Sequence, residues 1–222
     1  MTTEEFREKA GDEEWAPGWD EIEAAFGEIY GAQEPSHFGT LITSRAIFGG
    51  NEFLDGYSAY RSPKGYSHIV TFGMSELYAV EEKLGGKYSK WGYEMTIKLM
   101  GEDPQNCVWA MNMLGNLARY TFKSENWFEP GEYVGHLKDP QSINLSKPES
   151  MITSLLVTND TEIRSRQTIY GELAFLQLVG ITTNELRVIM NDKSLVPVLL
   201  DAIRADYPDL QTDMGRTKEY LQ

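Results

Sequence analysis

The sequence predicts an α+β fold, in which a mixed and largely antiparallel β-sheet is flanked by helices in a single domain. Several short segments alternate apolar and polar residues, which is the period of a strand, and others repeat apolar residues at the three- and four-residue spacing of a helix. The strand segments outnumber the helical ones and do not alternate with them regularly, which favours a largely antiparallel sheet. With 222 residues, 41% of them hydrophobic, the chain can bury one substantial core.

We assign residues 16–222 to this one domain, because the chain shows no internal repeat, low-complexity tract or interdomain linker. Residues 1–15 are polar and charged and have no clear period. We therefore expect a loosely ordered segment at the N-terminus.

Two helices are predicted in the first half of the chain. Pro17 begins a helix over residues 17–30, whose apolar residues share one stripe, and Gly31 ends it. Asp103 and Pro104 form the N-cap and first turn of a second helix that continues toward Phe122.

Two shorter helices are predicted further along. Thr182 and Glu185 form a capping box at the start of a helix that ends near Met190. Ser194 is expected to cap a last helix over residues 195–203.

The predicted strands are rich in β-branched and aromatic residues and are bounded by glycine, proline or polar turns. They cover residues 40–48, 57–61, 68–72, 91–100, 151–158 and 173–181. Strict alternation over 91–100 indicates a half-buried strand, whereas the dense apolar run at 173–181 indicates a central strand covered on both faces. We expect the strands to contribute to a common core through Phe48, Phe72, Tyr93, Leu156 and Phe175.

The charge balance limits the class of partner. Asp and Glu number 34 against 20 Lys and Arg, so the formal net charge is -14. This charge repels nucleic acid and anionic membrane surfaces, and no local basic patch offsets it. A basic protein partner fits such a surface, although solubility alone also accounts for it.

The chain carries no expected export signal or membrane anchor. Its start is acidic, and eighteen apolar residues never run together. The single cysteine, Cys107, forms no internal disulfide, which fits a reducing compartment. We expect a soluble, cytoplasmic protein.

The motifs of common catalytic and metal sites are absent from the sequence. His37, His68 and His136 are too far apart for a local metal motif. Ser75 lacks the second glycine of a nucleophile elbow, and Cys107 has no nearby histidine in the sequence. We therefore predict no catalytic residue, no metal site and no cofactor, and we rank His68 as the best candidate for a role in a groove.

The predicted loops instead combine charge with flat apolar side chains, as interfaces do. We select Glu76, Tyr78, Glu125 and Trp127 as partner-binding residues, and we add His68 from its predicted strand. Core positions for Tyr78 and Trp127 are the alternative. The residues do not identify the partner, the edge strand used for binding or the oligomeric state.

A series of short motifs in fixed order resembles the suppressor of fused family. The series consists of Phe48-Gly49-Gly50, Leu54-Asp55-Gly56, Gly73-Met74-Ser75-Glu76-Leu77-Tyr78, Trp91-Gly92-Tyr93-Glu94-Met95-Thr96, Leu117-Ala118-Arg119-Tyr120, Leu155-Leu156-Val157-Thr158-Asn159-Asp160 and Phe175-Leu176-Gln177-Leu178-Val179-Gly180. The resemblance extends over roughly residues 18–213 by inspection. In length the chain is more similar to stand-alone bacterial members than to the two-domain eukaryotic protein.

The resemblance implies a non-catalytic domain that binds a protein or peptide partner. The eukaryotic protein holds a short peptide of a Hedgehog transcription factor as a strand between its two domains. This chain has Ala79-Val80 where the eukaryotic pattern has Gly-Asp, so an acidic contact of that type is not carried over.

For the bacterial members, the resemblance implies immunity proteins that neutralise a cognate toxin by direct binding. A basic toxin domain is then the expected partner, with neither nucleic acid nor membrane involved. The alternative function is a small-molecule-binding or enzymatic domain with an aromatic and acidic cleft.

Overall fold

The computed structural model describes residues 1–39 and 54–221. Within these residues the strands form one eight-stranded sheet with the order β1-β2-β3-β4-β8-β6-β5, and β7 pairs with β8 beside this path. Only the central β4–β8 pair among the described strand pairs is parallel. The prediction of a mixed, largely antiparallel sheet is confirmed.

The strands have the following bounds. They are β1 (Ser36–Gly39), β2 (Gly56–Arg61), β3 (Tyr66–Phe72), β4 (Tyr88–Met100), β5 (Tyr133–Val134), β6 (Ile152–Asn159), β7 (Arg166–Thr168) and β8 (Gly171–Thr182). The two long strands β4 and β8 lie side by side at the centre of the sheet, where both of their faces are buried.

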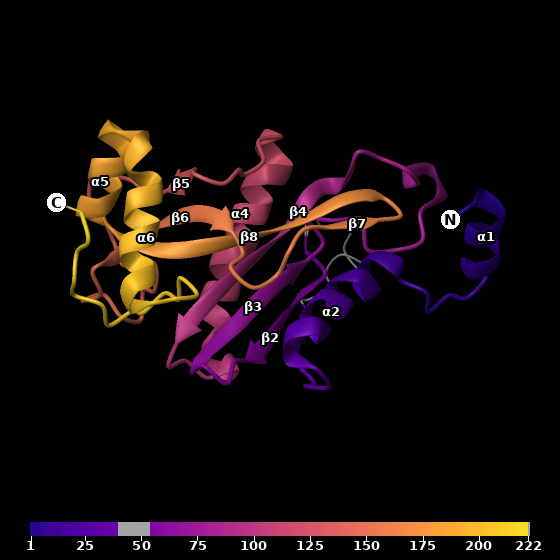
Figure 1. Cartoon of the computed structure of the whole chain (residues 1–222), viewed down its shortest axis with the longest axis horizontal. Helices are drawn as coiled ribbons and strands as arrows, with labels where there is room; N and C mark the ends of the chain where they lie inside the picture. Colours follow the sequence, from indigo (N-terminus) through magenta and orange to yellow (C-terminus); the bar gives the residue numbers. More distant parts are fainter. Residues whose placement is uncertain (40–53, 222) are drawn as a thin grey trace.

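The helices cover both faces of the sheet. They are α1 (Thr3–Lys9), α2 (Pro17–Tyr30), α4 (Val108–Ser124), α5 (Thr183–Asn191) and α6 (Val196–Asp206), with short 3-10 turns η1 (Glu81–Lys83), η2 (Pro104–Asn106) and η3 (Lys193–Leu195). Figure 1 shows α4 behind the sheet, with α2 and α6 in front of it toward opposite ends. The chain termini also lie at opposite ends of the view.

Strand alternation divides the interior into three apolar clusters. One packs α4 against the sheet and includes Tyr93, Leu155 and Leu176. A second packs α2 on the other face around Phe72 and Phe175, and a third packs α5 and α6 against β6 and β8. The first cluster joins early and late parts of the chain, as the single-domain prediction requires.

The expectation of a common core needs a correction. Phe72 and Phe175 share the α2 cluster, Tyr93 lies in the α4 cluster and Leu156 in the α5–α6 cluster. Successive strand residues point to opposite faces of a sheet, so residues of one sheet are divided between two layers. Phe48, the predicted strand over 40–48 and the predicted turn at Gly49-Gly50 lie outside the described residues.

The predicted helices are present in the structure, but two of their predicted starts are wrong. Asp103 and Pro104 begin the 3-10 turn η2, and α4 starts after Cys107 without a side-chain cap. Helix α2 begins at Pro17 and ends before Gly31, and the Thr182–Glu185 capping box begins α5. The cap assigned to Ser194 is wrong: Asp192 accepts a hydrogen bond from the Ser194 N–H, and α6 starts from Leu195 without a side-chain cap. A 3-10 turn therefore stands where the cap was expected.

The N-terminal segment, which we expected to be loosely ordered, contains the helix α1. Thr2 and Glu5 form a capping box, and the buried Phe6 packs edge-on against Trp15 with ring centroids 5.2 Å apart. The Thr-x-x-Glu spacing is a local signal that indicates this helix. Among the described helices, none is long and apolar enough to cross a membrane.

Candidate functional site

The loop that follows α4 presents the largest exposed aromatic side chain of the predicted binding residues. Glu125 ends the helix in the left-handed conformation, with φ 58°, and its N–H bonds the Thr121 carbonyl. Gly131 and Glu132 then exchange backbone hydrogen bonds of 2.8 Å with Val157 of β6. The loop is thus held at both ends, while Trp127 between them is 55% exposed.

Trp127 forms part of a hollow of about 540 Å³ at the outer edge of this loop. The Tyr120 and Phe128 rings lie with their centroids 5.8 Å apart, and Tyr120 is 51% exposed. We call this region the aromatic surface. It consists of Tyr120, Trp127, Phe128 and Tyr133 with the polar residues Asn126, Glu129, Glu132 and Lys193.

Glu76 and Tyr78 lie on a different loop, between β3 and β4. The half-buried Glu76 donates its N–H to Ser89 Oγ at 2.9 Å. Tyr78 is 50% exposed, and its carbonyl accepts a hydrogen bond from the Tyr170 hydroxyl at 2.7 Å. The structure therefore exposes Tyr78 and Trp127 rather than placing either in the core.

This loop is anchored by the buried carboxylate of Glu94. The carboxylate accepts five hydrogen bonds, from the backbone N–H groups of Gly73, Met74 and Ser75 and from the hydroxyls of Thr71 and Ser75. Burial raises the pKa of Glu94, and these hydrogen bonds oppose that rise. The Gly-Met-Ser motif is thus a turn built around an acceptor, and the Ser75 hydroxyl is engaged with Glu94.

Glu125 and Trp127 share one loop, whereas Glu76 and Tyr78 share the other. A second hollow, of about 450 Å³, lies on the far side of Trp127 and extends to Tyr88 at the start of β4. Neither hollow beside Trp127 is lined by Glu76 or Tyr78. The four predicted residues therefore form two separate pairs, in which Glu76 is half-buried and the other three are exposed.

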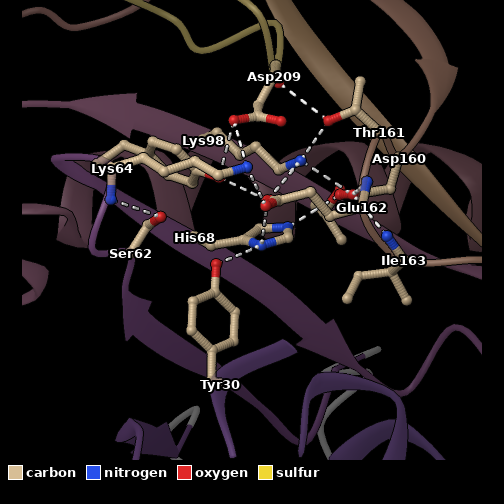
Figure 2. A network of polar contacts seen from close by, with 12 residues as sticks. Tyr30, Ser62, Lys64, His68, Lys98, Asp160, Thr161, Glu162, Ile163 and Asp209 are labelled. Carbon is tan, nitrogen blue, oxygen red and sulfur yellow. Dashed lines mark hydrogen bonds and ion pairs between the residues drawn. The ribbon is translucent and has the colours of Figure 1, made fainter. Parts of the chain in front are cut away.

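The fifth predicted residue, His68, is not on a surface. Its side chain is fully buried in β3, and Figure 2 shows it within a network of polar contacts. One ring nitrogen, Nε2, lies 2.9 Å from Asp160 Oδ2, and the other, Nδ1, lies 3.0 Å from the Tyr30 hydroxyl. This position corrects the expectation of a histidine in an open groove, because α2 covers the imidazole.

Charged groups from distant segments complete the network. The buried Lys98 ammonium lies 3.0 Å from Asp160 Oδ1 and 3.1 Å from Glu162 Oε2. Lys64 joins Glu162 to Asp209 at 2.9 and 2.8 Å. The network therefore connects β3, β4, the β6–β7 loop and the segment after α6 (Figure 2).

The carboxyl groups of the network are held in the ionised form. Burial alone would raise the pKa of Asp160, but the nearby His68 and Lys98 outweigh it and lower that pKa. Burial also opposes ionisation of Glu162, yet hydrogen bonds from Tyr66 and Lys64 and the Lys98 ammonium lower its pKa to about 2. A fully buried ion pair of this kind binds segments of the fold to one another, and it offers no access to a substrate.

The residues predicted for a functional site did not include Lys98, Asp160 or Glu162. Lys98 occupies the face of β4 that alternation assigned to solvent, together with Glu94 and Thr96, yet all three are 0% exposed. The prediction of a half-buried β4 is therefore wrong. In the part of the chain that the structure describes, no group of three or more His, Cys, Asp or Glu residues is arranged to hold a metal ion.

The fold and the surface define a class of protein: an α+β domain with a helix-covered sheet that presents aromatic and acidic loops at its surface. Residues 50–217 match the family model described as Suppressor of fused protein (SUFU). The chain belongs to this family.

Curated relatives support the assignment. The chain is 34% identical over 213 residues to Suppressor of fused homolog from Homo sapiens, and equally to that from Mus musculus. Each match includes 88% of this chain but 43% of the relative. The chain thus spans less than half the length of the curated relatives it matches.

Solved structures show the same fold. A chain in the Sufu-Fu complex crystal structure superposes with a TM-score of 0.78 at 25% identity, covering 92% of this chain and 93% of the other. Drosophila Suppressor of Fused gives a TM-score of 0.76 at 27% identity, covering 92% of this chain and 51% of the other. A SUFU homolog from Neisseria gonorrhoeae shares the fold at 14% identity, with a TM-score of 0.57 and coverage of 92% and 97%.

Proposed function

We propose that this chain is a non-catalytic protein-binding domain of the bacterial kind, and that it acts in the cytoplasm as an immunity protein that neutralises a basic toxin domain. The observation that carries the proposal is the aromatic surface, where exposed Tyr120 and Trp127 stand beside Glu129 and Glu132 around one hollow. Aromatic side chains dominate the energy of protein interfaces, and such a hollow receives a partner's side chain.

The charge of the whole chain supports a basic partner. A formal net charge of -14 attracts a positively charged domain over a long range and repels competing acidic proteins. Neutralising such a partner requires no catalytic residue in this chain, because binding over the basic active site of a toxin is sufficient to block it.

The comparisons support partner binding in general terms. One similar solved structure is described as a Sufu-Fu complex, so a protein with this fold binds another protein. Neutralisation of a toxin goes beyond that similarity, and it rests on the family resemblance together with the acidic, aromatic surface.

Immunity proteins of the bacterial kind are encoded beside their toxins, so the proposal is tested with the protein encoded by the neighbouring gene. Co-expression of the two proteins is expected to restore growth that the neighbour alone inhibits, and the purified pair is expected to form a stoichiometric complex. Trp127→Ala should weaken both effects. Asp201→Asn, an exposed substitution on α6, is the matched control that should leave both unchanged. A neighbour that is harmless, or that never binds the purified chain, would contradict the proposal.

A further inference from the structure

The second hollow beside Trp127 has an apolar floor and aromatic walls. Ala174 and Leu176 of β8 form the floor, and Tyr88, Trp91 and Trp127 stand around it. Its volume is about 450 Å³. Phe128, Glu129 and Pro130 of the loop after α4 complete its lining together with Trp127.

The shape of the hollow follows from an irregularity in β4. The β4–β8 register shifts between Tyr88 and Tyr93, and Lys90 and Gly92 both have positive φ, of 55° and 83°. A side chain at Gly92 would lie 3.2 Å from Tyr88 Cβ, so glycine permits the Tyr88 side chain to lie against the strand. Such bulges redirect side chains at the edges of binding sites.

The charged residues of the hollow favour a cation over an anion as its ligand. Glu129 and Glu172 both line it. Lys90 also lines it, but its ammonium donates to the Gly73 carbonyl at 2.5 Å and lies 4.9 Å from the Phe122 ring centroid. Lys87, next to the hollow, lies over the Tyr88 ring at 4.7 Å. Both ammonium groups are thus engaged with a carbonyl or an aromatic ring, and Glu129 and Glu172 are the carboxylates that line the hollow.

We propose that this hollow is a recognition pocket for an arginine side chain of the partner protein, an inference that rests on the proposed function. The planar guanidinium stacks on the Trp127 or Trp91 ring and forms two-pronged hydrogen bonds with a carboxylate, here Glu129 or Glu172. Its aliphatic stem packs on the floor of Ala174 and Leu176. A lysine, a point charge without a flat face, matches these walls less well.

The test uses short peptides, so that it does not depend on identifying the natural partner. A displayed library of random nine-residue peptides is selected on the purified full chain, and the enriched peptides are synthesised with arginine, lysine or citrulline at each basic position. Affinities are measured by titration calorimetry. We expect the enriched peptides to share an arginine, and we expect citrulline, which keeps the shape but not the charge, to weaken binding about tenfold or more.

Variants locate the binding in the pocket. Glu129→Gln with Glu172→Gln should weaken the arginine peptide about tenfold or more, and Trp127→Ala should weaken it further. The matched control removes two exposed carboxylates elsewhere, Glu149→Gln with Asp201→Asn, and should change the affinity less than twofold. The double variant Glu129→Gln with Glu172→Gln changes only exposed carboxylates, so it tests the pocket even if Trp127→Ala fails to fold. Thermal melting shows whether each variant is folded.

Three outcomes would overturn the pocket: no enriched peptide, enriched peptides without arginine, or arginine peptides that bind the double variant Glu129→Gln with Glu172→Gln as tightly as the wild type. These results are distinct from failure of the proposed function. If Trp127→Ala weakens binding of the toxin but the pocket binds no arginine peptide, the protein-binding proposal stands. Only the assignment of arginine to the pocket is then lost.

Discussion

Trp127 separates the two hollows, and its indole forms a wall of each. The sequence indicated an aromatic residue in an acidic loop, and the structure exposes 55% of it. An exposed ring of this size between two concave surfaces is the residue type that contributes most to binding in protein interfaces.

Replacing this ring tests the surface directly. Trp127→Ala is expected to raise the dissociation rate of a bound partner by about tenfold or more, with a smaller change in the association rate, because lost contacts act after encounter. Surface plasmon resonance measures both rates. Asp201→Asn, an exposed substitution on α6 that lines neither hollow, is the control expected to retain the wild-type dissociation rate within about threefold. An unchanged dissociation rate for folded Trp127→Ala would remove this residue from the interface.

Glu162 makes stability depend on pH. Its pKa in the folded protein is about 2, below its ordinary value of 4.5, because hydrogen bonds from Tyr66 and Lys64 and the Lys98 charge outweigh the effect of burial. A lowered folded-state pKa contributes stability above about 4.5 and loses it as the pH falls toward about 2. The free energy of unfolding should therefore decrease on acidification through this range, by on the order of 2 kcal/mol from Glu162.

The comparison variant is Glu162→Gln, measured by urea unfolding at several pH values between about 5 and 2. This range spans the ordinary pKa of Glu162, 4.5, and its pKa in the folded protein, about 2. The loss of stability with acid should be smaller than in the wild type. Glu149→Gln removes an exposed carboxyl outside the network and should retain the wild-type slope. Equal slopes for wild type and Glu162→Gln would show that the network does not produce the acid sensitivity.

At the scale of elements, the segment after α6 is attached to α5 through a buried ion pair. Arg216 contacts both carboxylate oxygens of Glu185, at 2.7 and 2.9 Å, and also donates to the Gly180 carbonyl. Glu185 is at the same time the capping-box residue of α5. One carboxylate thus begins a helix and holds a segment about thirty residues further along the chain.

Breaking this pair tests the attachment. Arg216→Ala should lower the free energy of unfolding by about 3–5 kcal/mol, because the buried Glu185 carboxylate is left without its cation. Chemical denaturation provides the measurement. Arg204→Ala breaks an exposed pair with Asp201 on α6 and should cost about 0.5 kcal/mol or less. Similar costs for the two variants would mean that Arg216 is not a structural anchor.

For the molecule as a whole, the excess of negative charge is expected to affect the association rate with a basic partner more than the affinity. The pairs Glu76 with Tyr78 and Glu125 with Trp127 lie on separate loops, so we expect their charges to act through the long-range field and not as one contact patch. A basic partner is attracted by this field from beyond contact distance, and salt screens the attraction.

Removing two of these charges should therefore slow association. Glu76→Gln together with Glu125→Gln is expected to reduce the association rate about two- to fivefold at low salt and to weaken its salt dependence, with little change in the dissociation rate. Stopped-flow mixing at several salt concentrations measures this effect. Unchanged rates and salt response in the folded double variant would exclude these residues from the approach of the partner.

Local patterns in the sequence were sufficient to predict the fold class, the helix that begins at Pro17 and ends before Gly31, the capping box of Thr182 and Glu185, and the resemblance to the family. Each is a local signal: periodicity, a cap or a short motif is complete within a few neighbouring residues. The acidic, aromatic character of the loop at Trp127 was also visible in this way, whereas the hollows on its two sides were not.

The tertiary structure alone decided what lies opposite each residue. Alternation along β4 marked Glu94, Thr96 and Lys98 as the polar face, but all three are buried and have partners from other segments. Asp160 of the β6–β7 loop accepts hydrogen bonds from Thr96 and Lys98, and the turn after β3 donates to Glu94. His68 is in contact with Asp160, which is 92 residues away in sequence. A buried charge is stable only where distant segments bring its counter-charge and donors, and that arrangement depends on how the sheet and helices pack, which no local pattern encodes.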